Sequence, residues 1–172
     1  MSTEDIKIGQ DAPLFKLQSY NAGMIDLEEL IGSQKIVLIF SRYFGCPICH
    51  LELNQILERY EEIEDKGAKL LYITQSGDKI AKEFIKNKGI TFPVIASTKD
   101  DLYKEYGLGM MTPEAVKQVR KKVKEAFAAG IEHGEYEGWE QQGEGQFIID
   151  EQGKIIHARK GWLDLDSMIE IL

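Results

Sequence analysis

The chain has 172 residues, of which 43% are apolar and 29% are charged, a composition typical of a globular protein rather than a disordered or fibrous one. A chain of this length fits one domain, residues 1–172, and buries roughly 70% of the surface that its unfolded form exposes. The net charge of −8 argues against nucleic acid and anionic membranes as partners, because proteins bind both mainly through Lys and Arg.

The N-terminal segment, residues 1–5, is acidic and lacks the apolar run of an export signal. The longest apolar run, residues 36–40, is far shorter than the about 20 residues that cross a bilayer. We therefore expect a cytoplasmic protein with no membrane partner. In that reducing compartment two neighbouring cysteines are more often catalytic or metal-binding than structural.

The first part of the chain predicts a β-hairpin, a helical turn and a buried strand. Residues 14–17 and 24–27 alternate in hydrophobicity around a turn at 20–23. Residues 28–31 are predicted to form a single helical turn. Residues 35–40 are almost continuously apolar and rich in β-branched side chains, which is typical of a central strand that is covered on both faces.

A long helix follows, and after it strands and helices alternate. Apolar residues recur every three or four positions between Cys46 and Gly67, with charged residues, Glu52 among them, in between. This period predicts one amphipathic helix. The next predicted elements are a strand, a helix, a strand and a short helix, at residues 69–74, 78–88, 91–96 and 100–106. Asp78 is the expected N-cap of the first of these helices, and Gly89 is its expected end.

The C-terminal part predicts a second hairpin and a closing helix. Residues 146–150 and 154–159 are strand-like runs around a turn that contains Gly153. Residues 164–172 are predicted to form the last helix. The alternation along the chain predicts an α/β fold with a central, mostly parallel sheet flanked by helices.

Residues 108–145 are not needed by this alternation and predict an insertion made of a helix and a loop. Thr112 and Pro113 suit the N-cap and the first position of the helix. Its expected apolar stripe consists of Val116, Val119, Val123 and Phe127. Residues 130–145 are rich in Gly and Glu, so we expect a mobile loop that covers or edges the active site.

The predicted inserted helix also carries a run of basic side chains in an otherwise acidic chain. These side chains are Lys117, Arg120, Lys121, Lys122 and Lys124. Most simply they form the solvated face of an amphipathic helix. The alternative interpretation is a docking site for an acidic partner.

Cys46 and Cys49 are the only cysteines of the chain. Pro47 favours the first turn of a helix, so Cys46 is expected at the N-cap, where unpaired N–H groups and the helix dipole favour a thiolate. Cys49 lies one turn further on the same face, close enough for a disulfide. We predict Cys46 as the nucleophile and Cys49 as the resolving thiol. Arg42 either supplies a positive charge to the thiolate and a bound oxidant or is a surface residue at a strand end.

Three other interpretations of the cysteine pair compete with thiol redox chemistry. A zinc site needs about four ligands, and only three scattered histidines, His50, His133 and His157, accompany the two cysteines. The sequence also matches the Cys-x-x-Cys-His haem attachment pattern, but no export signal is present and a strand precedes the pair. The spacing can also be accidental. We expect neither a metal nor a cofactor.

Several motifs resemble a known family. They are the Phe-Gly-Cys-Pro-Ile-Cys sequence at residues 44–49, together with residues 9–15, 92–96, 106–108 and 147–155. With the preceding Arg42, they are similar to the peroxiredoxin-like branch of the alkyl hydroperoxide reductase and thiol-specific antioxidant family, over most of the chain. The resemblance implies a thioredoxin-like fold, and the peroxiredoxin-like branch also carries an insertion at the position of residues 108–145.

The resemblance also implies a reaction and its partners. Cys46 attacks a hydroperoxide and becomes a sulfenic acid, and Cys49 condenses with it to form a disulfide. A cellular dithiol such as a thioredoxin or a glutaredoxin then reduces that disulfide. A homodimer is a further expectation.

This sequence departs from the family pattern at three positions. Peroxiredoxins carry Thr or Ser three residues before the reactive cysteine and Pro seven before it, where this chain has Tyr43 and Ile39. Ser41 or the Tyr43 phenol is the candidate substitute for the missing hydroxyl. The family arginine before the strand at 147–150 is replaced by Glu144. Two alternatives therefore stay open: a thioredoxin-type disulfide reductase, and a non-enzymatic, redox-controlled binding module that uses the insertion.

Overall fold

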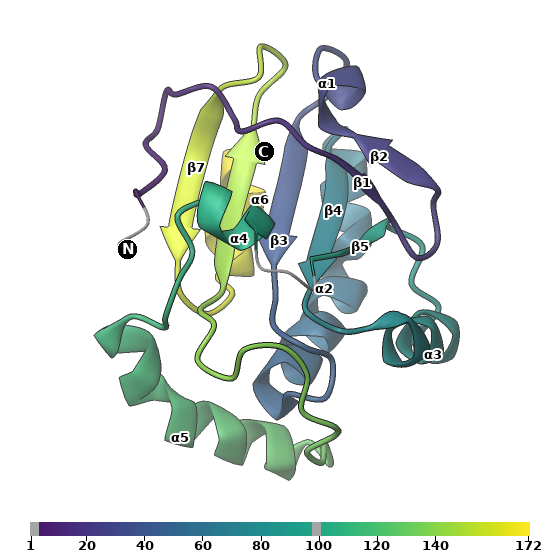
Figure 1. Cartoon of the computed structure of the whole chain (residues 1–172), viewed down its shortest axis with the longest axis vertical. Helices are drawn as coiled ribbons and strands as arrows, with labels where there is room; N and C mark the ends of the chain where they lie inside the picture. The colour runs from purple at the N-terminus through teal and green to yellow at the C-terminus, as the bar shows by residue number, and fades with distance from the viewer. Residues whose placement is uncertain (1–3, 98–100) are drawn as a thin grey trace.

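The computed structural model describes residues 4–97 and 101–172, which build a five-stranded sheet with helices on both faces (Figure 1). The strands are β3 (Ile36–Phe40), β4 (Lys69–Thr74), β5 (Val94–Ala96), β6 (Gly145–Ile149) and β7 (Ile155–Lys160). Their order is β5-β4-β3-β6-β7, with parallel pairing among β3, β4 and β5 and antiparallel pairing of β6 with both its neighbours. Four of these five strands run in one direction, so the predicted mostly parallel α/β sheet is confirmed.

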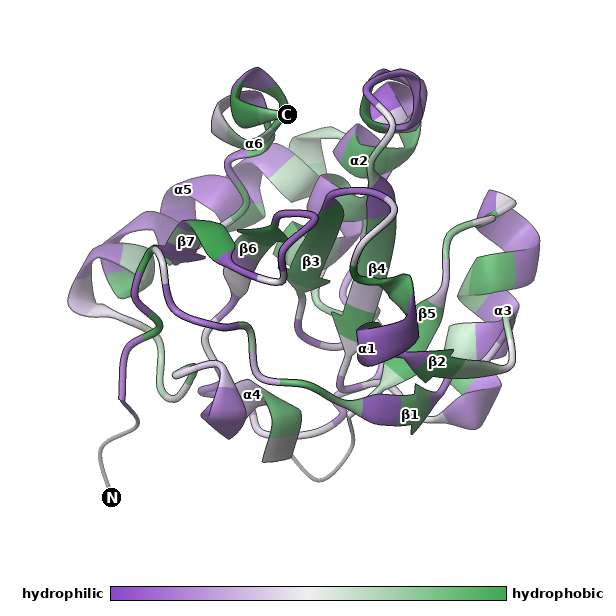
Figure 2. Cartoon of the chain, turned by 90° about the horizontal axis from the view of Figure 1, so that it is seen from above, coloured by the Kyte–Doolittle hydropathy of each residue, from purple (hydrophilic) through white to green (hydrophobic). Residues whose placement is uncertain are grey.

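The helices cover the two faces of the sheet. They are α1 (Leu27–Leu30), α2 (Pro47–Asp65), α3 (Asp78–Lys88), α4 (Asp101–Glu105), α5 (Pro113–Ala128) and α6 (Leu165–Ile171). Figure 2 shows α2 and α6 on one side of the sheet and α1 and α4 on the other. All five residues of β3 are buried. Val37 and Ile39 enter the core beneath α2, whereas Leu38 and Phe40 enter the opposite core, as alternation along a central strand requires.

Both predicted hairpins are present. The first pairs β1 (Lys16–Gln18) with β2 (Met24–Asp26), so its first strand begins two residues later than predicted. The predicted strand at 91–96 is too long, because β5 begins only at Val94. Pro93 has no N–H for a ladder, and the Asn21 side chain accepts from the Val94 N–H at 3.0 Å and donates to the Phe92 carbonyl at 2.9 Å.

The start of α3 differs from the sequence-based expectation. Asp78 is the first helical residue rather than the N-cap, which is Gly77. The Asp78 carboxylate instead forms an ion pair with Lys82 at 2.8 Å. The backbone N–H of Gly77 donates to Glu137 Oε2 at 2.7 Å. The start of α3 therefore has no N-cap side chain, and a side chain from the insertion binds the backbone N–H of its N-cap residue instead.

Helix α5 begins as predicted, with Thr112 as N-cap accepting from the Ala115 N–H at 3.2 Å. The predicted apolar stripe is partly wrong, because Val116 and Phe127 are 56% and 53% exposed. The face toward the body is lined by small or partly buried residues, namely Ala115, Val119, Val123 and Ala126. Because alanine side chains are small, the backbone of α5 can lie close to the body of the protein on this face. The buried face of α5 is therefore rotated away from the side on which Val116 and Phe127 lie. Figure 1 shows α5 beyond the end of the sheet at which β3 and β7 finish.

The short helix α4 and the C-terminal helix α6 lie close to their predicted positions. Helix α6 is capped by Asp164, which accepts from the Ser167 N–H at 3.2 Å. The first residue of the predicted helix 100–106 lies outside the described residues, and α4 ends at Glu105. Within residues 4–97 and 101–172, no helix combines the length and the apolar character needed to cross a membrane.

Candidate active site

The two cysteines lie where β3 ends and α2 begins. Cys46 is the N-cap of α2 and Pro47 its first residue, as predicted. The Cys46 Sγ accepts from the Cys49 N–H at 3.4 Å, so the thiol itself caps the helix. Both thiols are unbridged and only 2% and 1% exposed. The sequence therefore delivers a buried dithiol to the carboxyl end of the central strand.

Arg42 points at this dithiol. Its Nη1 lies 3.4 Å from the Cys46 Sγ, and the residue is only 5% exposed. The interpretation as a surface arginine is therefore wrong. The guanidinium also lies over the Tyr43 ring, 5.2 Å from its centroid. A buried cation that faces a thiol favours the thiolate.

The pKa values of the two thiols shift in opposite directions. The pKa of Cys46 is lowered, first by a hydrogen bond from the Cys49 thiol and then by the Arg42 charge and the Cys49 N–H, against the effect of burial. The pKa of Cys49 is raised well above its ordinary value, mainly because the side chain is fully buried. The pair is thus poised with Cys46 as the anion and Cys49 as the proton carrier.

Two buried carboxyl groups lie behind Cys49. The Cys49 Sγ lies 3.1 Å from Glu144 Oε2, so the single proton of this thiol can be directed either to that oxygen or to the Cys46 sulfur. The pKa of Glu144 is raised to about 7, above all by burial. Burial also raises the pKa of Glu52 well above its usual range, and the nearby Glu144 raises it further. Glu52 Oε2 accepts from the Leu163 N–H at 2.6 Å. At neutral pH the two carboxyl groups therefore hold a proton between them.

Neither carboxyl group was predicted to belong to the site. The amphipathic period counts Glu52 among the charged residues of α2, yet it is 6% exposed and faces the dithiol cluster. Glu144 was identified only as the residue that replaces the family arginine. In the sequence, Glu144 stands between two glycines immediately before a buried strand. This position alone does not show which residues the Glu144 side chain faces.

Cys49, Glu52 and Glu144 are also the described residues that could together hold a metal ion, since their ligand atoms lie within 4.8 Å of one another. A metal would require all three groups to lose their protons. Burial instead raises all three pKa values and favours the protonated forms. The cluster is therefore better suited to sharing a proton than to binding a cation.

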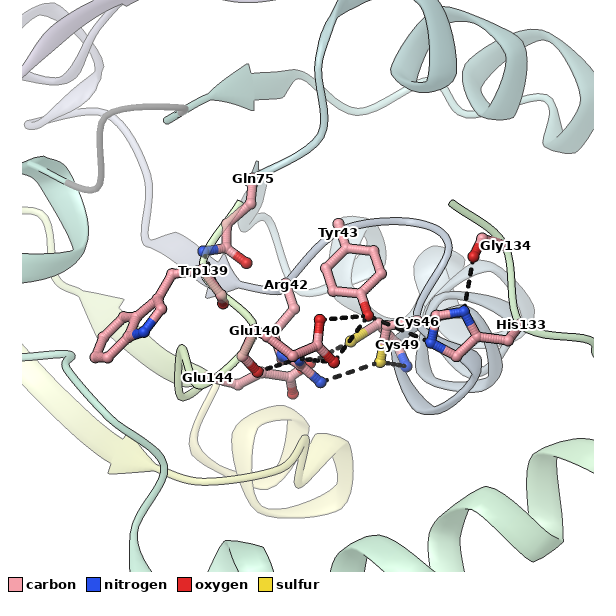
Figure 3. A network of polar contacts seen from close by, with 10 residues as sticks. All are labelled: Arg42, Tyr43, Cys46, Cys49, Gln75, His133, Gly134, Trp139, Glu140 and Glu144. Carbon is pink, nitrogen blue, oxygen red and sulfur yellow. Dashed lines mark hydrogen bonds and ion pairs between the residues drawn. The ribbon is translucent and has the colours of Figure 1, made fainter. Parts of the chain in front are cut away.

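The predicted loop of the insertion covers the dithiol, as expected. We call residues 133–142 the lid. Arg42 Nη2 donates to the Glu140 carbonyl at 2.5 Å and lies 3.2 Å from its Oε1 (Figure 3). The Tyr43 hydroxyl donates to Glu140 Oε2 at 2.9 Å, and the Gly134 N–H donates to the Gly45 carbonyl at 2.8 Å. The lid is therefore fixed at two places to the turn that precedes Cys46, through Glu140 to Arg42 and Tyr43 and through Gly134 to Gly45.

The two hydroxyls that were candidates to replace the family Thr are already engaged. The Tyr43 hydroxyl donates to Glu140. The Ser41 hydroxyl points to Glu144 Oε2 at 3.5 Å, a long contact. With the lid closed, neither proton is directed to an oxidant at Cys46. Arg42, whose Nη1 lies 3.4 Å from the Cys46 Sγ, is the donor that faces the reacting thiol.

His50 does not join the site. Its ring packs edge-on against Phe84, with centroids 5.2 Å apart, and burial lowers its pKa. A cavity of about 10 Å³ lies beside Glu144, lined by residues 108–112 and 160–162. This volume admits roughly one water molecule beside the Glu144 carboxyl group.

Comparison with known proteins decides the family. The model of the AhpC/TSA family matches residues 8–158, a range that includes both cysteines and the whole insertion. The chain belongs to the AhpC/TSA family. The resemblance inferred from the motifs is thereby confirmed, and so is the thioredoxin-like, peroxiredoxin-type fold.

The relatives that the chain matches carry two kinds of names. The chain is 29% identical over 106 residues to the thiol-disulfide oxidoreductase ResA of Bacillus subtilis, covering 60% of this chain and 57% of that protein. It is 26% identical over 91 residues to alkyl hydroperoxide reductase E of Mycobacterium bovis, covering 53% of this chain and 60% of that protein. Each match therefore spans less than two thirds of the relative.

Solved structures agree with the fold. The reduced 2-Cys peroxiredoxin of Plasmodium vivax superimposes with a TM-score of 0.70 at 15% identity, covering 95% of this chain and 79% of that one. At this identity the similarity extends to the fold, including the layers that position the first turn of α2, and not to individual side chains.

Proposed function

We propose that the protein is a thiol peroxidase in which Cys46 is the nucleophile, Cys49 the resolving thiol and Arg42 the residue that stabilises charge at Cys46. The Cys46 thiolate attacks one peroxide oxygen and the O–O bond breaks. The second oxygen leaves as an alcohol or water after taking a proton, and Cys46 becomes a sulfenic acid. The observation that carries this proposal is the opposite shift of the two thiol pKa values around Arg42.

The second half of the reaction uses the buried carboxyl group. Cys49 must lose its proton to attack the Cys46 sulfur, and its Sγ lies within hydrogen-bond distance of Glu144 Oε2, at 3.1 Å. A carboxyl group with a pKa of about 7 is suited to accept that proton near neutral pH. The hydroxyl of the sulfenic acid leaves as water and the Cys46–Cys49 disulfide forms. A cellular dithiol, of the thioredoxin or glutaredoxin type, then reduces it by thiol exchange.

A disulfide reductase is the second candidate function. It is supported by the relative named thiol-disulfide oxidoreductase and by the engagement of the Tyr43 hydroxyl with Glu140 rather than with an oxidant. In this case Cys46 attacks the sulfur of a substrate disulfide, and Cys49 releases the reduced product. The same two thiols and the same proton acceptor serve both reactions.

The setting of the protein is part of the proposal. We place it in the cytoplasm, where dithiol proteins are kept reduced, as one folded unit over residues 1–172 with an insertion at about 108–145. A homodimer is the expected assembly, which sedimentation of the reduced protein tests directly.

Rapid mixing of the reduced protein with hydrogen peroxide and with an organic hydroperoxide tests the peroxidase. Cys46 should react at least about 100-fold faster than free cysteine, because its pKa is lowered and Arg42 faces its sulfur, where charge changes in the reaction. Cys49→Ser should stop at a sulfenic acid that dimedone traps, and Cys46→Ser should yield none.

Rates equal to those of free cysteine would contradict the peroxidase. Rapid reduction of insulin disulfides in the same preparation would then favour the reductase. A Cys46→Ser variant that behaves like the wild type in cells would favour the non-enzymatic binding module.

A further inference from the structure

The lid closes the dithiol off from large molecules. Cys46 and Cys49 are almost completely buried, although the turn that carries them lies at an edge of the sheet where active sites of α/β proteins are usually open. Residues from the lid meet this turn at Arg42, Tyr43 and Gly45. A small peroxide needs only a narrow path to Cys46, whereas a protein thiol or disulfide must place its own backbone against this turn.

Glu140 fastens one end of the lid. Its carboxylate lies 3.2 Å from Arg42 Nη2 and accepts from the Tyr43 hydroxyl at 2.9 Å. Figure 3 shows Arg42, Glu140 and Cys46 gathered together, and Arg42 contacts Glu140 Oε1 through Nη2 and the Cys46 sulfur through Nη1. The same guanidinium therefore faces the reacting thiol with one nitrogen and holds the lid with another. The Glu140 side chain itself is 54% exposed, so solvent can compete for it and the lid can open.

Two glycines fit the other end of the lid onto the active-site turn. A Cβ on Gly134 would lie 2.9 Å from the Gly45 Cα, and a Cβ on Gly45 would lie 2.4 Å from the Glu135 carbonyl oxygen. Both obstacles are backbone atoms, so a side chain at either position forces the lid and the turn apart. The backbone φ of Gly134 does not require glycine, since it lies outside the left-handed range. The close approach of Gly134 to the Gly45 backbone explains why position 134 has no side chain.

We propose that the lid, fastened by Glu140 and seated through Gly134, determines which partners reach Cys46. Closed, it admits small oxidants and small thiols and excludes protein thiols and disulfides. Opening of the lid therefore limits every step that involves a macromolecule, including reduction of the Cys46–Cys49 disulfide by a dithiol protein. The inference rests on the proposed thiol chemistry only in that Cys46 must be reactive.

The test compares two reagents of different size on the same thiol. Iodoacetamide and a 5-kDa polyethylene glycol maleimide (a size chosen to be on the order of a small protein domain) are reacted with the reduced protein, and modification of Cys46 is followed by mass spectrometry. The ratio of the two rates cancels any change in the fraction of Cys46 that is ionised, because both reagents attack the same thiolate. It needs no peroxidase activity, so it stands even where the peroxidase proposal fails.

Glu140→Gln and Gly134→Val should each raise the relative rate of the large reagent at least about tenfold, as expected when a closed state that dominates the population is lost. Glu132→Gln, an exposed carboxylate just outside the lid, should leave the ratio unchanged. Reduction of the disulfide by thioredoxin, relative to dithiothreitol, should accelerate in the same two variants. Urea unfolding checks that both variants are folded.

An unchanged ratio in both folded variants would overturn the proposal. So would a wild-type protein whose Cys46 reacts equally well with the two reagents after allowance for their intrinsic rates. If Gly134→Val fails to fold, Glu140→Gln decides the question alone. Glu140 is exposed and glutamine has the same shape as glutamate, so this substitution should not disturb folding.

Discussion

At the scale of single residues, the reactivity of Cys46 depends on what surrounds its sulfur. We predict that Arg42→Met raises the pKa of Cys46 by about one unit or more, because it removes a buried positive charge 3.4 Å from the Sγ. The fraction of thiolate at neutral pH then falls. The pH dependence of alkylation of Cys46 by iodoacetamide measures this midpoint, and Arg59→Met, on the exposed part of α2, is the matched control. Midpoints that coincide in the wild type and Arg42→Met would refute the role of the charge.

At the same scale, the chemistry depends on a division of labour between two otherwise similar thiols. Cys46 sits at a helix end, where N–H groups and Arg42 stabilise an anion. Cys49 sits one turn deeper against Glu144, where burial disfavours an anion. Sequence spacing alone gave this order of roles, but only the position of Glu144 explains how the second thiol can be activated after the first has reacted.

At the scale of elements, the insertion supports the body as well as covering it. Glu137 accepts from the Gly77 N–H at the start of α3. We predict that Glu137→Ala lowers the free energy of unfolding by about 1 kcal/mol, the usual cost of losing one partly buried hydrogen bond, here to the Gly77 N–H. Asp78→Ala, at the residue that sequence reasoning expected to be the cap, should cost about 0.5 kcal/mol, since it loses only an exposed ion pair and a dipole interaction. Urea unfolding of both variants measures the two values, and a larger loss for Asp78→Ala would reverse the assignment.

Elements set by local pattern could be predicted, and contacts between distant segments could not. The five apolar residues of β3 and the Cys46-Pro47 helix start follow from composition and capping rules, and the structure has both. The burial of Glu52 could not be predicted, because it depends on Glu144, which is far away in the sequence and lies on a different layer. The rotation of α5 was missed for a similar reason, since the surface against which it packs is built by other elements.

At the scale of the whole molecule, the buried carboxyl groups make stability depend on pH. Glu144 keeps its proton up to about pH 7 in the folded protein, whereas its ordinary pKa is 4.5. Between these values the unfolded chain releases the proton more readily than the folded one, so stability falls as pH rises through this window and levels off above it. The fall due to this group is at most about 3 kcal/mol. Glu144→Gln should remove it, so the free energy of unfolding of the variant, measured in urea from pH 5 to 8, should gain on the wild type as pH rises. The exposed Glu170→Gln should follow the wild type, and a constant difference between Glu144→Gln and the wild type at all pH values would show that Glu144 is charged in the folded protein throughout.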